Sequence, residues 1–258
     1  MHQTGTNSNL ERQGDETRNK THAGRLWEKP ILRIYVLTRT SDRPAQFKRC
    51  RESVLAQEGV DDVVHVVSID RPCRYVEGDI IVPARGAIRP AVPDFYKDQA
   101  PAEHNLYIND LLDAIDEDGW VIVLDDDDEF MTRDSLARLA PHLREDNLVI
   151  CKFVVYDRLI PPDFGTKVPM HFISGSCFVF HAKHRKAAYW FERYGGDGSA
   201  ACNLAARLPV TWVDEVIAGA QGMLSAGKME KVAYQPWHER DTSNIKTTSL
   251  SASGQLMP

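Results

Sequence analysis

The acidic residues at positions 125–129 follow directly on the apolar stretch 120–124. Two carboxylates about 4 Å apart repel each other by about 4 kcal/mol at an effective dielectric constant of about 20. The run must therefore spread into water or be neutralised by cations. Mg2+ and Mn2+ prefer carboxylate oxygens and bind phosphates, so the run is a candidate divalent-cation site. The D-x-D-x-D-G-x5-E spacing of a calcium loop is absent.

The other interpretation of this run is an acidic loop that is solvated or caps the following helix. Glu129 and Asp134 fit that role best. His181 and His184, spaced three apart, resemble a metal pair, but no further His or Cys ligand stands near them in the sequence. A surface or capping role is therefore favoured for both histidines.

Asp197 is a second carboxylate placed where it could do chemistry. It follows Gly195 and Gly196 and precedes a helical stretch. A carboxylate directed into a cleft can take the proton of a hydroxyl group, and Asp is also favoured at a helix N-cap. The sequence leaves both interpretations open, and one residue could serve both roles.

Alternating strands and helices must position these residues. Short apolar runs predict strands over 31–38, 62–70, 78–84, 120–124, 147–156 and 171–181. Amphipathic stretches predict helices over 43–59, 100–119, 132–143 with Thr132 as N-cap, and 202–208. Such alternation is typical of a doubly wound parallel sheet, which binds ligands beyond the carboxyl ends of its strands. The loop from Thr38, Asp70 and the acidic run should therefore meet at one edge.

The composition limits the class of protein. The 258 residues are 43% hydrophobic and carry a net charge of -6, which disfavours a general nucleic-acid binder. The five cysteines form no C-x-x-C pair and fit buried thiols in a reducing cytoplasm. The sequence has no run of 18 apolar residues and no apolar signal core, so it predicts neither a membrane span nor export. Residues 1–29 and 242–258 are polar and predict flexible extensions around one domain.

The segment "VIVLDDDDEF" resembles the D-x-D segment of the GT-A glycosyltransferases, especially the inverting family 2. "RIYVLTRTSDRPAQFKRCRESVLAQ" is similar to the opening strand, nucleotide loop and first helix of that family, and "VVHVVSID" to its second strand. "AEHNLYINDLLDAIDEDGWVIVLDDDD" is similar to the helix with an early Asn that leads into D-x-D. The resemblance covers about residues 31–245. It implies an α/β, Rossmann-like GT-A fold: a mostly parallel doubly wound sheet flanked by helices, with a smaller acceptor-side subregion.

The resemblance also implies a donor site and two halves of the domain, 30–130 for the nucleotide and 131–241 for the acceptor. Asp127 would be the main ligand of Mn2+ or Mg2+, with Asp126 or Asp128 assisting. Asp125 would lie near the ribose and diphosphate, and Asp70 would bind the base. Residues of the nucleotide loop and of the early helix would complete the site; they are Thr38, Arg39, Arg43 and Asn105. The donor would be a nucleotide-diphosphate sugar, preferably a UDP-sugar, although "IDRP" stands where the family commonly has "DDGS".

The second half of the chain would supply the base and a closing loop. Asp197 corresponds to the family's catalytic acid, although Gly196 precedes it where the family more often has Glu. "YQPWHERDTSN" is similar to a C-terminal loop of many GT-A enzymes, in which His238 would complete the metal shell; a structural role is the other interpretation of this single histidine. Arg240 would contact the diphosphate, and Trp237 would pack on the sugar or close the cleft. The sequence therefore predicts a metal-dependent, inverting glycosyltransferase.

Two other functions fit parts of the sequence. A nucleotidyltransferase also joins a doubly wound sheet to acidic ligands, but its Gly-rich, Lys-containing phosphate loop is absent after the first strand. A non-catalytic sugar- or nucleotide-binding module would not require the intact acidic run and the candidate base. Growing glycans and lipid-linked saccharides are the expected acceptors, and a hydroxylated DNA base is disfavoured by the net charge.

Overall fold

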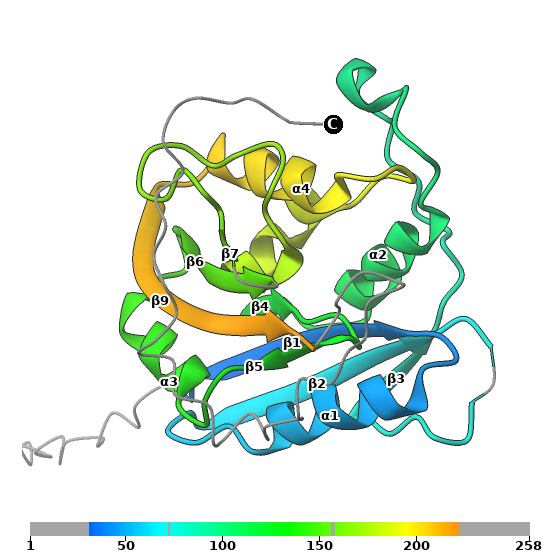
Figure 1. Ribbon diagram of the computed structural model, residues 1–258, viewed down its shortest axis with the longest axis vertical. Coiled ribbons are helices and arrows are strands. Elements are labelled where there is room, and N and C mark those ends of the chain that lie inside the picture. The colour runs from blue at the N-terminus through cyan, green and yellow to red at the C-terminus, as the bar shows by residue number, and fades with distance from the viewer. Residues whose placement is uncertain (1–30, 72, 156–157, 222–258) are drawn as a thin grey trace, which may run out of the picture. The chain divides into compact units, whose positions relative to one another are not determined.

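A mixed sheet flanked by helices is the central feature of the computed structural model, which describes residues 31–71, 73–155 and 158–221 (Figure 1). The two predicted extensions and the loop with Trp237, His238 and Arg240 lie outside the described residues. Among the described residues, no helix has the length and apolar character needed to cross a membrane.

The first half of the sheet is parallel. Its strands lie in the order β3 (Ile80–Pro83), β2 (Asp62–Ile69), β1 (Arg33–Thr40) and β4 (Trp120–Val123). β1 is almost entirely buried, as its continuous apolar run predicts for a strand covered on both faces. The strand order reverses at β1, because β2 and β3 lie on one side of it and β4 on the other.

The second half continues the same sheet with mixed pairing. β8 (Phe178–His181), β6 (Leu148–Val155), β9 (Val210–Ala220) and β5 (Asp128–Phe130) follow β4 in that order, and β7 (Arg158–Ile160) pairs with β6. β6 and β9 are parallel, whereas the other pairs of this half are antiparallel. β9 is long and strongly curved (Figure 1). The expected α/β, Rossmann-like class is confirmed, with its parallel core in the first half.

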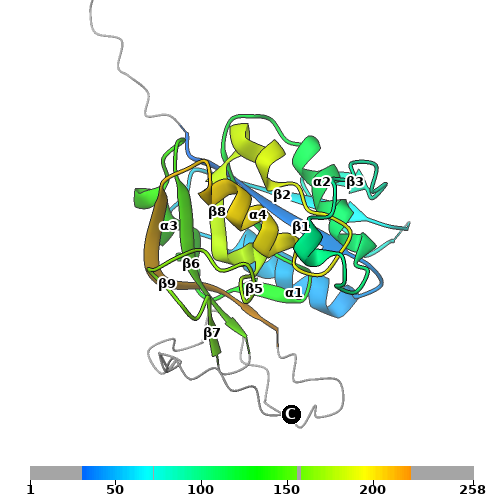
Figure 2. The same cartoon turned by 90° about the horizontal axis from the view of Figure 1, so that it is seen from above.

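Helices cover both faces of the sheet (Figures 1 and 2). α1 (Pro44–Leu55) packs on one face, α2 (Leu106–Asp113) and α4 (Gly196–Ala205) on the other, and α3 (Ser135–Leu139) lies against β9. α1 begins at Pro44, whose fixed φ suits the first helical position. It buries Phe47, Cys50 and Val54 at helical spacing. Short 3-10 turns are Asp94–Tyr96, Glu103–Asn105, Ala140–His142, Gly175–Cys177 and Ala182–Ala188.

Three expected boundaries are wrong. The helix expected over 100–119 is α2 alone, preceded by the 3-10 turn at Glu103–Asn105. The strand expected over 171–181 is shortened to β8, because Gly175–Cys177 turn instead of extending. Thr132 is not the N-cap of α3. That position is Asp134, whose carboxylate accepts a hydrogen bond from Thr132 Oγ1 at 2.6 Å.

Candidate active site at the strand-order reversal

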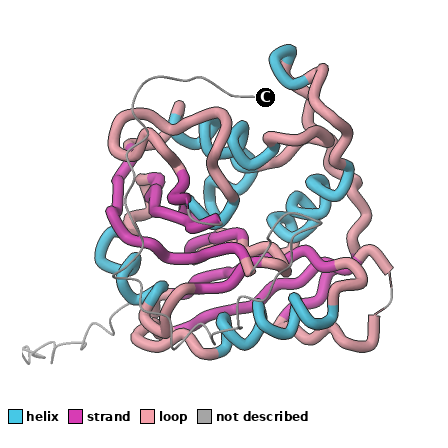
Figure 3. The backbone as a smooth tube through the Cα atoms, in the orientation of Figure 1, coloured by secondary structure: helices cyan, strands magenta, loops and turns pink. Residues whose placement is uncertain are grey.

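The carboxyl ends of β1 and β4 lie side by side. Leu37 pairs with Val123, and the Leu124 N–H donates to Leu37 O at 2.9 Å. Because the strand order reverses here, the loops that leave the two strands diverge, and sheets of this class bind ligands in a crevice at such an edge. Figure 3 shows these strands ending in loops at this edge. The loop after β1 and the acidic run after β4 therefore meet, as the sequence predicts.

Two arginines neutralise the exposed part of the acidic run. Arg39 binds Asp125 with two parallel hydrogen bonds, Nε to Oδ1 at 2.8 Å and Nη2 to Oδ2 at 3.0 Å. Arg43 Nη1 lies 2.8 Å from Asp127 Oδ2 and 3.2 Å from Asp126 Oδ1. Charge-assisted pairs of this kind offset the repulsion between neighbouring carboxylates. The run is therefore held together by cationic side chains from two places: Arg39, expected in the nucleotide loop, lies in β1, and Arg43 lies in the loop that joins β1 to α1.

The aspartates of the run alternate between two environments. Asp126 and Asp128 are buried, whereas Asp125 and Asp127 remain partly exposed. Asp126 accepts a hydrogen bond from Thr40 Oγ1 at 2.8 Å, and burial raises its pKa to about 6. Asp128 accepts from Ser176 Oγ at 3.2 Å, and burial raises its pKa well above the usual range. Asp125 and Asp127 are thus the two most accessible carboxylates of the four.

Glu129 corrects one expectation, because it neither faces solvent nor caps a helix. Its side chain is fully buried in β5, where Glu129 pairs with Gly219 of β9. The acidic run therefore turns back into the sheet after Asp127, and its last two residues belong to a strand.

Arg39 connects the donor half with the acceptor half. Its Nη1 donates to Asn105 Oδ1 at 2.7 Å, and Asn105 Nδ2 donates in turn to Arg193 O at 2.7 Å. The guanidinium also lies 5.3 Å from the centre of the Trp190 ring, a cation–π distance. Asn105, expected in the nucleotide site, thus positions Arg39 and fixes the segment that leads into α4.

Asp197 lies in the first turn of α4, two residues after the N-cap. The N-cap is Gly195, whose φ of 92° is in the left-handed region that favours glycine. Asp197 Oδ1 accepts a hydrogen bond from Gly198 N at 2.7 Å. Burial raises its pKa to about 6, and the nearby charge of Arg39 opposes the rise. Asp197 is therefore a partly buried carboxylate that faces Arg39 across the crevice, and not the N-cap itself.

Thr38 lies beneath the nucleotide loop and not in its lining. It is fully buried, and its hydroxyl donates to Leu124 O at 2.7 Å. His65 Nε2 lies 2.9 Å from the same hydroxyl, and Arg51 Nη1 lies 3.1 Å from His65 Nδ1. Burial lowers the pKa of His65 to about 3, so the imidazole is neutral. This chain of hydrogen bonds supports the ends of β1 and β4 from within.

Asp70 lies where the sequence predicts, at the end of β2. It accepts a hydrogen bond from Ser41 Oγ at 2.8 Å, which ties it to the nucleotide loop. Tyr75 joins the same loop, because its hydroxyl accepts from Arg43 N at 3.2 Å and lies 3.4 Å from Thr40 Oγ1. No pattern in the sequence pointed to Tyr75, since its partners are more than thirty positions away along the chain.

Two further residues at the site were not predicted. Burial lowers the pKa of the His104 imidazole, and the charge of Arg39 lowers it further. The His104 ring is thus close enough to the Arg39–Asp125 pair for both charges to act on it. Gln221 holds the backbone of the acidic run, with its N–H donating to Asp127 O at 2.7 Å and its Nε2 to Asp128 O at 2.9 Å. The only signal for His104 was its position next to Asn105.

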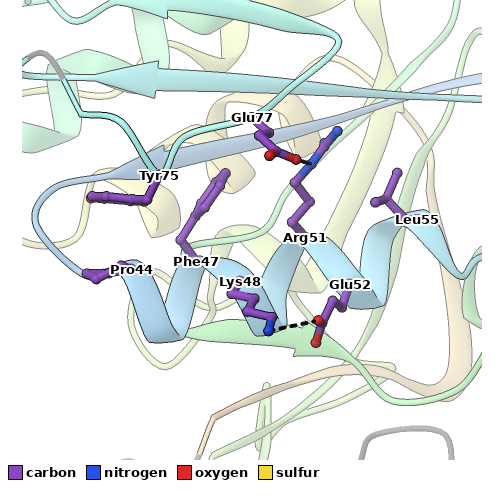
Figure 4. Close-up of a pocket in the computed structure, with 8 residues that line it drawn as sticks. All are labelled: Pro44, Phe47, Lys48, Arg51, Glu52, Leu55, Tyr75 and Glu77. Atoms are coloured by element: carbon purple, nitrogen blue, oxygen red, sulfur yellow. Dashed lines mark ion pairs between the residues drawn. The ribbon is translucent and has the colours of Figure 1, made fainter.

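A cavity of about 400 Å3 lies elsewhere, between α1 and residues 75–77 (Figure 4). Its lining residues are Pro44, Phe47, Lys48, Arg51, Glu52, Leu55, Tyr75 and Glu77. Its charged side chains form two weak pairs, Lys48 with Glu52 and Arg51 with Glu77, both at 3.8 Å. None of the aspartates 125–128 lines it, so this cavity is separate from the crevice.

The acidic run fits part of a divalent-cation site. Asp126 Oδ1 and Asp127 Oδ2 converge on one nitrogen of Arg43, so a cationic position exists between two carboxylates. Within the described residues, no three side chains of His, Cys, Asp or Glu are grouped to hold a metal ion. His238, the expected further ligand, lies outside the described residues. The two aspartates thus supply hard oxygen ligands that phosphate oxygens of a donor would complete.

Comparison with solved structures identifies the fold. No protein-family model and no curated protein sequence matches the chain. The crystal structure of S. aureus TarS 1–349 matches with a TM-score of 0.53 and 12% identity over 74% of this chain and 61% of that one. The chain has a GT-A-like glycosyltransferase fold. Its likeness to these structures spans less than two thirds of their own length.

Two matching structures contain nucleotide sugars. TarS 1–349 in complex with UDP-GlcNAc has a TM-score of 0.50 and 12% identity, covering 81% of this chain and 62% of that one. Mannosyltransferase PcManGT from Pyrobaculum calidifontis, in complex with GDP-Man and Mn2+, has a TM-score of 0.51 and 15% identity, covering 74% and 57%. At these identities the likeness establishes the GT-A-like fold of the present chain, and function must be argued from its own residues.

Proposed function

We propose that the protein is an inverting glycosyltransferase that moves a sugar from a nucleotide-diphosphate sugar to an acceptor hydroxyl. The observation that supports this most directly is that Arg39, which is paired with Asp125, lies close enough to Asp197 for its charge to act on that carboxylate. The Arg39–Asp125 pair lies at the carboxyl ends of β1 and β4, where such sheets bind nucleotides. The nucleotide sugars bound to the two matching structures support the same donor class.

The nucleotide loop would bind the donor. Asp70, oriented by Ser41, would accept a hydrogen bond from the base, and Asp125 would lie at the ribose. Arg43 has a half-exposed side chain and would turn from the aspartates to the diphosphate, for which a guanidinium is well suited. Arg240 would assist. A UDP-sugar is the preferred donor, and a GDP-sugar is the first alternative to test.

Asp127, with Asp126, would hold Mn2+ or Mg2+. Bound there, the cation would neutralise charge on the departing diphosphate, which is a Lewis-acid role. Asp127 is the better ligand, because its side chain is more exposed than that of Asp126, whose pKa is raised to about 6 by burial. His238 would complete the ligand set.

Asp197 would act as the general base. The acceptor oxygen attacks C1 of the sugar from the face opposite the diphosphate, the bond from C1 to the diphosphate oxygen breaks, and the hydroxyl proton moves to a carboxylate oxygen of Asp197. The configuration at C1 is thereby inverted. A base is most effective when its pKa lies near the working pH, and the pKa of Asp197 is raised to about 6 by burial.

Hydrolysis of UDP- and GDP-sugars with and without Mn2+ tests the proposal. We expect slow release of UDP from at least one UDP-sugar with Mn2+, and loss of this release on addition of a chelator. Binding of a nucleotide sugar without any turnover, with or without acceptors, would instead support the non-catalytic binding module. Release of pyrophosphate from a nucleoside triphosphate and a sugar phosphate would support the nucleotidyltransferase.

A further inference from the structure

Four exposed apolar side chains surround the start of α4. Among the described residues, seven large apolar side chains are exposed, and four of them are Phe95, Met170, Phe172 and Tyr194. We call these four residues the aromatic rim. Large apolar groups that gather on a surface often mark a binding site, whereas single ones need no explanation.

The rim is assembled from segments far apart in the sequence. The Phe95 ring lies 5.4 Å from the His171 ring and 5.3 Å from the Tyr96 ring. Tyr96 Oη donates to Met170 O at 3.1 Å, which brings the 94–96 turn against residues 170–172. Tyr194 joins through its N–H, which donates to Ala100 O at 3.1 Å. Figure 1 shows the segment that leads into α4 meeting the segment before α2.

The rim adjoins the candidate base. A Cβ on Gly195 would lie 2.5 Å from Tyr96 Cε1, and a Cβ on Gly198 would lie 2.0 Å from Met170 O. These glycines flank Asp197 on both sides, so the rim segments pack directly on the turn that holds the carboxylate. A molecule bound to the rim would therefore lie next to Asp197.

The rim also reaches the donor side of the crevice. The Tyr194 ring lies 6.3 Å from the His104 ring, and the next residue in the chain, Asn105, accepts a hydrogen bond from Arg39 Nη1 at 2.7 Å. His104 thus connects the rim with the nucleotide loop, as a surface shared by donor and acceptor requires.

Phe172 has a backbone conformation that packing does not explain. Its φ of 59° is in the left-handed region, which is a strained conformation for a bulky residue. Its side chain is 70% exposed, so the strain is not offset by burial in the core. Strain of this kind is concentrated at ligand-binding sites, and here it turns an aromatic ring towards solvent.

We infer that the aromatic rim is the acceptor site and that the acceptor is a saccharide, an inference that rests on the proposed function. A saccharide has apolar C–H faces that pack on aromatic rings and hydroxyl groups that hydrogen-bond to imidazole and carboxylate groups. The rim offers both kinds of group, with His104, His171 and Asp197 beside the apolar side chains. Nucleic acid and anionic lipid are less suitable, because they require basic residues. The turn at Phe95 carries two acids, Asp94 and Asp98, against Lys97.

Saturation-transfer NMR with chitotetraose, mannotetraose and cellotetraose tests the inference independently of turnover. We expect at least one of these saccharides to bind the wild-type protein, and Phe172→Ala and Tyr194→Ala to weaken it at least tenfold. Ile81→Ala is the matched control, because Ile81 is exposed on the edge strand β3, outside the rim. Binding of none of the three saccharides, or equal binding by the rim variants and the control, would overturn the inference.

Kinetics and stability separate this inference from the proposed function. In the rim variants, KM for the acceptor should rise at least tenfold, a larger change than the change in KM for the donor. Phe172→Gly should weaken saccharide binding like Phe172→Ala but unfold at a higher temperature than Phe172→Ala, because glycine relieves the backbone strain. Saccharide binding without any donor hydrolysis would overturn the proposed function alone. Hydrolysis with transfer only to DNA or to a lipid would overturn the saccharide acceptor alone.

Discussion

The two halves of the crevice present different chemistry. On the donor side, charged groups are paired with each other at short distances, as with Arg39 and Asp125 or Arg43 and Asp127. On the acceptor side, apolar rings are exposed around one carboxylate, Asp197. If the protein acts as proposed, the donor side would offer fixed charges to a ligand of constant diphosphate chemistry. The acceptor side would offer a surface on which different sugars can pack.

The acceptor side should give the largest single effect, at Asp197. Asp197→Asn should lower kcat about 10²- to 10⁴-fold, the usual contribution of a general base, without weakening donor binding. In the wild type, kcat/KM should rise as the pH rises through about 6, because the base acts when ionised and burial raises its pKa in the free enzyme to about 6. Steady-state kinetics between pH 5 and 8 would measure both.

Asp146→Asn, at an exposed position, serves as the control and should behave like the wild type. Equal kcat values in Asp197→Asn and the wild type would show that Asp197 is not the general base. The two halves of the crevice would then not differ by the presence of a general base.

The donor side should lose most of its function at Asp127. Asp127→Ala should lower kcat about 10²- to 10³-fold, because one contact to the charge that develops in the transition state is worth about 3 to 4 kcal/mol. The fold should persist, since the Asp127 side chain is 21% exposed. Turnover with Mn2+, together with circular dichroism, checks this prediction. Normal turnover would contradict the metal assignment.

Substitution of Arg43 should have two smaller effects of opposite sign, one on Mn2+ binding and one on donor binding. Its guanidinium occupies the cationic position between Asp126 and Asp127. Arg43→Ala should therefore tighten Mn2+ binding a few-fold in the absence of donor, and weaken binding of the nucleotide sugar about tenfold. Calorimetric titration measures both, with Arg144→Ala, an exposed site, as the control. A loss of Mn2+ affinity would show that Arg43 supports the site and does not compete for it.

Substitution of Thr38 should lower the stability of the protein and leave donor binding unchanged. Thr38→Val removes the buried hydroxyl that donates to Leu124 O and leaves that carbonyl without this partner. The free energy of unfolding should fall by about 1 to 3 kcal/mol, with KM for the donor unchanged. Urea denaturation compares it with Thr166→Val, whose hydroxyl donates on an exposed turn. A raised KM without destabilisation would return Thr38 to the lining of the nucleotide loop.

The parallel half of the fold could be predicted because its signals are local. β1 and β4 are buried on both faces, so each is a continuous apolar run, and the acidic residues mark the end of β4. The same reasoning failed at residues 171–181, where a 3-10 turn interrupts an equally apolar segment. It also placed Thr38 in the site, because alternation along a strand does not show which polar group a neighbouring carbonyl will bind.

The less local parts of the site could not be predicted from the sequence. Tyr75, His104 and Gln221 contact the loop or the acidic run through partners that only the fold brings near. The aromatic rim has the same origin, since Phe95 lies before β4 and Phe172 after β7 in the sequence. Pairs such as Arg39 with Asp125, 86 positions apart, were expected at the same sheet edge, but their bidentate geometry was not.

The position of Arg39 has a consequence for how donor and proton influence each other. Its single positive charge pairs with Asp125 and also favours the ionised form of Asp197. A diphosphate bound beside Arg39 would share that charge and make Asp197 a stronger base. Thermodynamic linkage requires the reciprocal effect, so the donor should bind more tightly at low pH, where Asp197 is protonated. One guanidinium would thus make the acceptor hydroxyl easier to deprotonate only after the donor has arrived, and so order the two substrates.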